Sequence, residues 1–336
     1  MTQGKKYVCL AIAILAGGAL RMPFERTLTG ELRAAQLMPP QLDVRTGEKI
    51  GQTFSAVSLG GLRTLVATFL NLRAFTFFSE QRWSDVADTY DTIVDLAPRT
   101  RYYWDTGSWH QAYNAASFYL YGESDLPPLR RKLAWRESIL KGRAFLETGI
   151  RNNPDDPILH ESLGRLLSDA NKIAAFESPA KAYKQAYDAY QTAVKTGHAR
   201  DYAKRAALYS LARVPGQEMQ ALALAEEISA GETIQLPTMQ GLLFSLRFHQ
   251  NPKQDVMKLV DSIFKDRKQA YEVLGNQWLR TRDYFPVFGV AKAAALLESE
   301  LKVSEDLSIL KAQLQPPMNP DDAFEDTRME KPRGGK

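Results

Sequence analysis

The sequence predicts an all-α protein. Two observations predict this class: apolar residues recur at helical spacing along most of the chain, and a proline or glycine ends many of these runs. A third observation is negative, because no segment shows the sustained apolar and polar alternation, bounded by turn signals, that marks a half-buried strand. The chain has 336 residues, which suffices for one large or two ordinary domains with a real core.

Five apolar stripes carry the prediction of helices. In each stripe, apolar side chains return every three or four residues and so share one face of a helix. The first stripe ends at Pro98, the second at Gly197 and the third at Gly231. The stripes are Trp83, Val86, Ala87, Tyr90, Val94 and Ala97; Tyr183, Tyr187, Tyr190 and Val194; Ala221, Leu224, Ala225 and Ile228; Val256, Leu259, Val260, Ile263 and Phe264; and Val287, Val290, Ala294, Leu297 and Leu301.

Residues 1–20 are predicted to be a signal peptide or an N-terminal membrane anchor. Lys5 and Lys6 form a charged start, and an apolar run extends from Tyr7 to Leu20. The run is shorter than the roughly 20 residues of a full membrane span and has the length of a signal-peptide core. A buried N-terminal helix is the alternative. Positive charges on both sides of the run leave the membrane orientation open.

The remainder of the chain divides into three predicted parts. Residues 21–53 form a connector, since prolines punctuate this stretch and no apolar period lasts. Residues 54–314 form the helical body. Residues 315–336 are rich in proline and charge and poor in apolar side chains, so we expect a disordered tail.

Residues 54–78 form a second apolar region, for which we predict a buried helix. Arg63 and Arg73 argue against a membrane span, because an arginine at the centre of a span costs about 2.5–3.5 kcal/mol. A helix that dips into the membrane is the alternative. The apolar positions at helical spacing are Leu62, Leu65, Val66, Phe69 and Leu72.

The prolines and glycines that end the apolar stripes recur at intervals of tens of residues, which indicates a repeat protein. The tetratricopeptide repeat (TPR) has small residues where two helices approach, aromatic residues that fill the gap, and a proline that ends the hairpin. With Pro98 as the closing proline, Ala74 takes the small position and Tyr90 the aromatic one. A later unit places Gly164 and Tyr190 in the same two roles. The chain therefore resembles a degenerate TPR array, an α-solenoid of antiparallel helical hairpins that follows the N-terminal segment.

Residues 55–118 also resemble a poorly characterised family of bacterial membrane-anchored TPR-like proteins. In that family, a Leu-Gly-Gly-Phe-Arg-Gly helix precedes a degenerate repeat that ends in Pro-Arg, and a Trp and an Ala-Tyr-Asn motif follow. The corresponding residues are Leu59-Gly60-Gly61-Leu62-Arg63, Pro98-Arg99, Trp109 and Ala112-Tyr113-Asn114, with Thr64 where the family tends to have glycine. The resemblance implies an envelope-facing scaffold and no reaction.

Aromatic side chains concentrate between residues 102 and 121, and they predict a partner-binding patch, since Tyr and Trp are favoured at interfaces. Core filling between hairpins is the alternative, and it is the role expected of Trp104. Asn71 fits one position of a dicarboxylate clamp for peptide C-termini, but Thr106 and Glu161 do not fit, so the clamp itself is not predicted. The candidate partner-binding residues are Asn71, Tyr102, Asp105, Trp109 and Tyr113.

No constellation in the sequence predicts catalysis, a cofactor or a metal. The Gly-rich phosphate loops and the GxSxG motif do not occur, and HESLG at His160 lacks the second histidine of a zinc site. The single cysteine, Cys9, excludes an intramolecular disulfide and a Cys-based metal site. The net charge of +4 is small and is spread along the chain, which gives no case for nucleic-acid binding.

These observations favour a non-enzymatic, membrane-tethered scaffold or adaptor that binds one or more partner proteins in a bacterial envelope assembly. We expect it at the cell membrane, anchored by its N-terminus, with the soluble part on the periplasmic or extracytoplasmic side. A cleaved, periplasmic form is the alternative. A cell-wall- or carbohydrate-binding module that uses the same aromatic residues is the alternative function, and an enzyme has the least support.

Overall fold

The computed structural model describes residues 63–122, 126–231 and 236–312, together with a few isolated positions before residue 30. Every regular element in these ranges is a helix, which confirms the all-α prediction. Apart from the isolated positions, the predicted anchor (1–20), connector (21–53) and tail (315–336) lie outside the described residues. The chain divides into two compact units, one formed by residues 1–111 and 148–154 and the other by residues 112–147 and 155–336.

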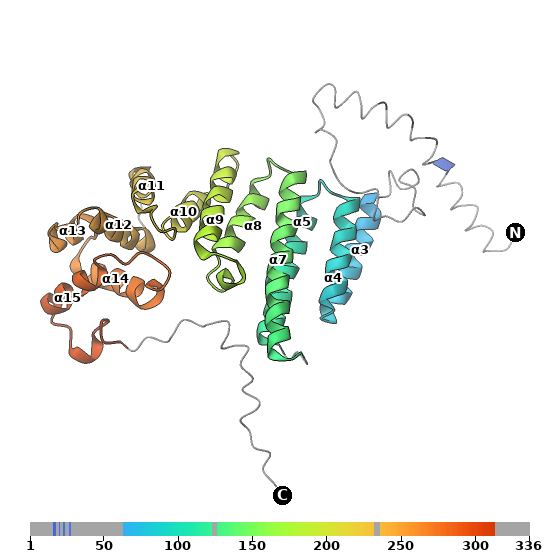
Figure 1. Ribbon diagram of the computed structural model, residues 1–336. Coiled ribbons are helices and arrows are strands. Elements are labelled where there is room, and N and C mark those ends of the chain that lie inside the picture. Colours follow the sequence, from blue (N-terminus) through green and yellow to red (C-terminus); the bar gives the residue numbers. More distant parts are fainter. Residues whose placement is uncertain are drawn as a thin grey trace, which may run out of the picture. The chain divides into compact units, whose positions relative to one another are not determined.

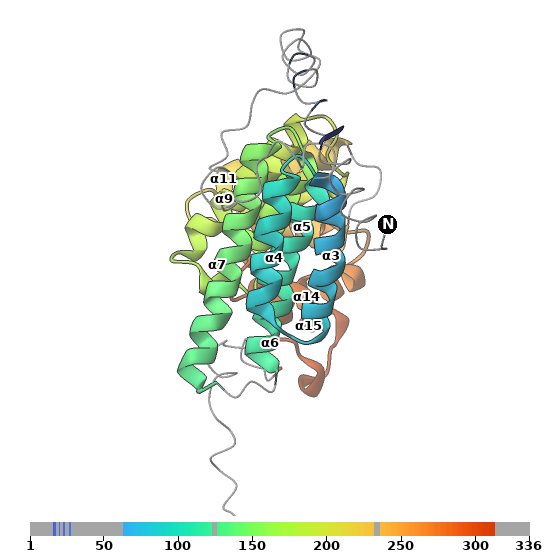
Figure 2. The same ribbon diagram turned by 90° about the vertical axis from the view of Figure 1, so that its right-hand side faces the viewer.

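The first unit contains three successive helices, which lie side by side in Figure 2. They are α3 (Arg63–Ser79), α4 (Trp83–Leu96) and α5 (Arg101–Trp109), and α4 packs against both of the others. A tight turn ends α3, in which Gln81 adopts a left-handed φ of 56°. The Arg82 N–H then donates to the Phe77 carbonyl at 2.9 Å, which satisfies a carbonyl that the helix end leaves open. The chain reverses within three residues, so α3 and α4 run antiparallel.

The helix predicted within residues 54–78 is confirmed by α3, but the prediction that its apolar stripe is buried is wrong. Leu65, Phe69 and Leu72 are 50%, 63% and 62% exposed. The helix is instead buried through Ala67 and Ala74, whose small side chains let the two backbones approach closely. Ala67 and Ala74 are seven residues apart and therefore share one face of the helix, while the larger side chains project from the opposite face.

The stripe predicted for α4 is buried as expected. α4 contacts α5, in which Trp104 is also buried. The Trp104 indole N–H donates to the Pro98 carbonyl at 2.8 Å, and the Asn153 side-chain amide donates to the same oxygen at 3.0 Å. A Cβ atom on Gly149 would lie only 2.8 Å from the Trp104 side chain. The indole fits against the helix because Gly149 has no side chain. Trp104 therefore belongs to the core, as the sequence predicts.

The second unit begins within a π-helix and continues through a long helix to a tightly packed pair. Asp156, one residue before the proline that begins the helix, caps α8, because its carboxylate accepts the Ile158 N–H at 2.9 Å. The elements are η1 (His110–Ala115), α6 (Ala116–Tyr121), α7 (Pro128–Asn152), α8 (Pro157–Ser168), η2 (Ile173–Ala175), α9 (Pro179–Lys195) and α10 (Tyr202–Leu211). The boundary between the two units passes through η1 and α7. Figure 1 labels α7, α8, α9 and α10.

Gly164 marks the place where α8 and α9 come closest. A Cβ atom at Gly164 would lie 2.8 Å from the Tyr190 ring, which is well inside van der Waals contact. Tyr190 is buried, and this burial raises the pKa of its hydroxyl to about 12. The close contact predicted at this glycine is confirmed.

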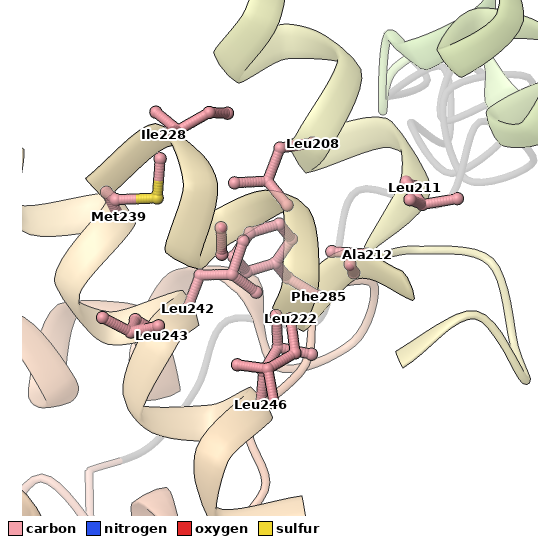
Figure 3. Close-up of a cluster of buried hydrophobic side chains, with 12 residues drawn as sticks. Leu208, Leu211, Ala212, Leu222, Ile228, Met239, Leu242, Leu243, Leu246 and Phe285 are labelled. Carbon is pink, nitrogen blue, oxygen red and sulfur yellow. The ribbon is translucent and has the colours of Figure 1, made fainter. Parts of the chain in front are cut away.

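The C-terminal part of the second unit has five further helices around two apolar clusters. Figure 3 shows the first cluster, in which side chains from α10, α11 and α12 converge with Phe285. The second cluster joins Phe244 of α12 to Val260, Leu274 and Val290 of the last three helices. The helices are α11 (Glu218–Gly231), α12 (Pro237–Gln250), α13 (Val256–Ile263), α14 (Arg267–Thr281) and α15 (Val290–Leu301).

The contact between Gly164 and Tyr190 yields a test of the packing. Gly164→Leu should lower the free energy of unfolding by roughly 1–3 kcal/mol, because the new side chain would overpack against the Tyr190 ring. Gly231→Leu is the matched control, since Gly231 is also helical but a Cβ atom there would meet no neighbouring atom within 4 Å. Chemical denaturation of both variants measures the difference, and equal stabilities would mean that the α8–α9 contact is loose.

Candidate functional site

Three of the five candidate residues lie on one face of α5. Tyr102, Asp105 and Trp109 are spaced i, i+3 and i+7, which on a helix places them in a single line. Tyr102 is 54% exposed and Trp109 is 45% exposed, and Asp105 lies half-buried between them. We call this line of three residues the α5 face.

The opposite side of α5 explains why these aromatic residues stay at the surface. Tyr103 and Trp104 are buried there, together with Gly107 and Ser108. Because Trp104 is fixed by its hydrogen bond to Pro98 and its contact with Gly149, the helix cannot rotate to bury Trp109 without extracting Trp104. The core on one side therefore determines which aromatic residues remain exposed on the other.

Asn71, the fourth candidate, takes part in the contact between α3 and α4. The Tyr90 hydroxyl donates to the Asn71 side-chain oxygen at 2.9 Å. Tyr90 is buried, and burial, followed by the nearby Tyr102 and Tyr103, raises the pKa of its hydroxyl. Asn71 thus satisfies a buried hydroxyl, which gives it a structural role in the first unit.

His110, which the sequence analysis did not single out, lies next to the α5 face. Its ring centroid is 5.0 Å from that of Phe78 and 5.4 Å from that of Tyr90, and burial lowers the pKa of the imidazole. The residue begins the π-helix η1, a wide turn of the kind that often occurs at functional sites. No spacing in the sequence distinguishes this turn from an ordinary helical turn.

Tyr113, the fifth candidate, belongs to the second unit. The Lys172 ammonium group lies 4.2 Å from the centroid of its ring, a cation–π contact, and also pairs with the Asp169 carboxylate at 3.0 Å. One face of the ring is therefore covered from within its own unit. Tyr113 contributes to the packing of η1, which agrees with core filling, the alternative to the partner-binding patch.

Glu161 has a buried structural role in the second unit. Its carboxylate accepts the Arg200 backbone N–H at 2.9 Å and the Tyr202 hydroxyl at 3.0 Å, and it pairs with the Arg200 guanidinium group. The side chain is fully buried, so these partners offset the cost of removing the charge from water. The network ties the start of α10 to α8.

A cavity of about 400 Å³ lies in the second unit between the start of α12 and one face of α14. Its polar lining includes Glu272, Asn276, Gln277 and Arg280, without a pair of side chains that resembles a nucleophile and its base. In the ranges that the structure describes, no group of three or more His, Cys, Asp or Glu side chains could hold a metal ion. Those ranges also contain no helix long and apolar enough to cross a membrane.

Comparisons with known proteins add no relative. No protein-family model matches the chain, and neither the curated proteins nor the solved structures give a significant match.

The two tryptophans of α5 should respond differently to truncation. Trp104→Ala should lower the free energy of unfolding by roughly 3–5 kcal/mol, because it removes a buried indole and its hydrogen bond to Pro98. Trp109→Ala should cost less than about 1 kcal/mol, because almost half of the side chain is already in water. Denaturation curves of the two variants check this, and a similar loss in both would place Trp109 in the core.

Proposed function

We propose that the chain is a non-enzymatic, membrane-tethered scaffold that captures a partner protein on the α5 face. The observation that carries the proposal is the line of Tyr102, Asp105 and Trp109, two exposed aromatic rings with a carboxylate between them, on a helix fixed by Trp104. Rigid aromatic side chains lose little entropy when they bind and dominate the energetics of many interfaces.

The architecture we propose is an α-solenoid of degenerate TPR-like hairpins. Support comes from the order of the contacts: within each unit, the main helix contacts join helices one or two places apart along the chain. In the second unit, α8, α9, α10, α11 and α12 each pack against the next helix, and α8 also reaches α10. Contacts restricted to near neighbours are typical of repeat proteins, which bind partners on extended surfaces. The contact between Gly164 and Tyr190 agrees with the small and aromatic positions of the repeat, and Gly149 makes a similar contact with Trp104.

The α5 face yields a test of partner capture. Full-length protein with Tyr102→Ala and Trp109→Ala should lose a partner that the unaltered protein retains in a pull-down from solubilised membranes. An interface aromatic contributes 2 kcal/mol or more, so each loss should weaken binding by about thirtyfold. Tyr121→Ala is the matched control, because Tyr121 is a 60% exposed tyrosine on α6 that is not part of the α5 face.

The result also separates the two candidate functions. A defined co-purifying protein that is lost in the double variant and kept in the Tyr121 variant supports the scaffold. Retention in the cell-wall fraction without any protein, again dependent on Tyr102 and Trp109, would replace the scaffold by a carbohydrate-binding module. If neither the double variant nor the Tyr121 variant loses the captured protein, the α5 face is not the binding site.

The tether is proposed from the apolar run of residues 7–20 behind two lysines, with the helical body on the extracytoplasmic side. Full-length protein should sediment with membranes, and a truncated chain that begins at Gln41 should sediment far less. Fractionation followed by high-salt washing measures this, because a protein held only by surface charge is released by salt. Uncleaved full-length protein in the soluble fraction would contradict the tether.

A further inference from the structure

One face of α3 carries the most prominent exposed apolar stripe of the first unit. Leu65, Phe69, Leu72 and Phe75 are 50%, 63%, 62% and 70% exposed. Their spacing places them on the side of the helix that points away from Ala67 and Ala74 and thus from α4. Side chains of this size are unfavourable in water, and a contiguous apolar patch of this kind marks a surface that something covers.

The charges on α3 indicate the chemistry of what covers it. The helix contains Arg63 and Arg73 and no aspartate or glutamate. Arg73 is exposed, lies beside the stripe, and is 5.2 Å from the centroid of the Phe77 ring, which supports the stem of the side chain. The Thr68 hydroxyl on the same side donates to the Thr64 carbonyl at 2.9 Å, so this polar group already has a partner and needs none from water. An apolar stripe flanked by a cation fits an anionic lipid surface.

A second copy of the chain fits the stripe less well. Four side chains at these exposures present on the order of 500 Å², which is below the roughly 800 Å² per partner of a stable interface. Two α3 helices that met through this stripe would also bring their Arg73 side chains into the same small contact, and like charges there are unfavourable. A bilayer sets no such requirement for area or shape.

The contact between α3 and α4 decides how α3 would meet a bilayer. The helix is fixed to α4 through Ala67 and Ala74, so it cannot leave the unit to insert across the membrane. It therefore meets the bilayer along its side, with only the stripe among the acyl chains.

We propose that α3 is a membrane-surface helix, with Leu65, Phe69, Leu72 and Phe75 among the acyl chains of an anionic bilayer and Arg73 at the lipid phosphates. This proposal rests on the tether proposed above and deepens it. Stable peripheral attachment commonly takes two signals, and α3 is the second one, which lays the first unit against the surface to which residues 7–20 hold it. Because α3 is the first described helix after the connector, it is the part of the body closest along the chain to the tether.

The test places a fluorescent probe on α3 of the full-length chain. Cys9→Ser removes the native thiol, and Leu72→Cys or the control Thr92→Cys on the exposed side of α4 receives the probe. Both sites are exposed, and unchanged melting curves verify that the labelled proteins are folded. The vesicles contain phosphatidylcholine and phosphatidylglycerol together with a lipid that carries a nitroxide quencher on its acyl chain.

The probe at position 72 should be quenched, and the probe at position 92 should not. Arg73→Gln should reduce the quenching at position 72 by up to about fivefold on anionic vesicles, because one arginine at such a surface is worth about that factor. The same substitution should have little effect on vesicles of phosphatidylcholine alone. Equal quenching at positions 72 and 92 would overturn the proposal. The proposal would also be overturned if position 72 stays unquenched while energy transfer between labelled copies rises with protein concentration. That result would assign the stripe to a contact with a second copy of the chain.

Sedimentation of the same samples distinguishes the failure of α3 from the failure of the tether. Protein that sediments with an unquenched probe at position 72 overturns the role of α3 and leaves the tether in place. Quenching at position 72 in a chain truncated before Gln41 supports α3 and shows that the tether is not needed for it. Protein that neither sediments nor shows quenching overturns both proposals.

Discussion

The close approach of helices at glycine, with an aromatic ring in the space that a side chain would otherwise fill, is the interaction on which the structure depends. In the first unit the indole of Trp104 lies against Gly149, and in the second unit the ring of Tyr190 lies against Gly164. Each contact buries a large ring at a point where two helix backbones are close, so it combines apolar burial with a strict steric limit. Short helices such as α5 and α8 gain their stability from such tertiary contacts and not from intrinsic helix propensity.

This constraint also determines the surface. Trp104 fixes the rotation of α5, and the same rotation leaves Tyr102, Asp105 and Trp109 in a line toward solvent. For the proposed capture of a partner, a surface on a helix that cannot rotate is preorganised, so little entropy would be lost on binding. Two contacts lie close to this region. The Tyr90 hydroxyl donates a hydrogen bond to Asn71, and the His110 ring packs against the Phe78 ring.

The first unit uses two different kinds of apolar surface. α4 buries a broad stripe of large residues, whereas α3 buries only small ones and leaves leucine and phenylalanine exposed. An exposed helix face with large apolar side chains is unfavourable in water. In the proposed attachment to a bilayer, this face of α3 is no longer in contact with water.

The sequence by itself determined the helical class, the positions of α4, α9 and α11 and the close contact at Gly164, because each depends on spacing or on local chemistry. It also separated Trp104 from Trp109, whose five-residue spacing turns them to different sides of one helix. Only the tertiary structure decided which face of α3 is buried, namely that of Ala67 and Ala74. It also decided that Asn71 accepts a hydrogen bond from Tyr90 and that the Lys172 ammonium group lies over the Tyr113 ring. A helix such as α3, with apolar residues on more than one side, has several possible buried faces, and the side that packs depends on how closely the neighbouring helix can approach.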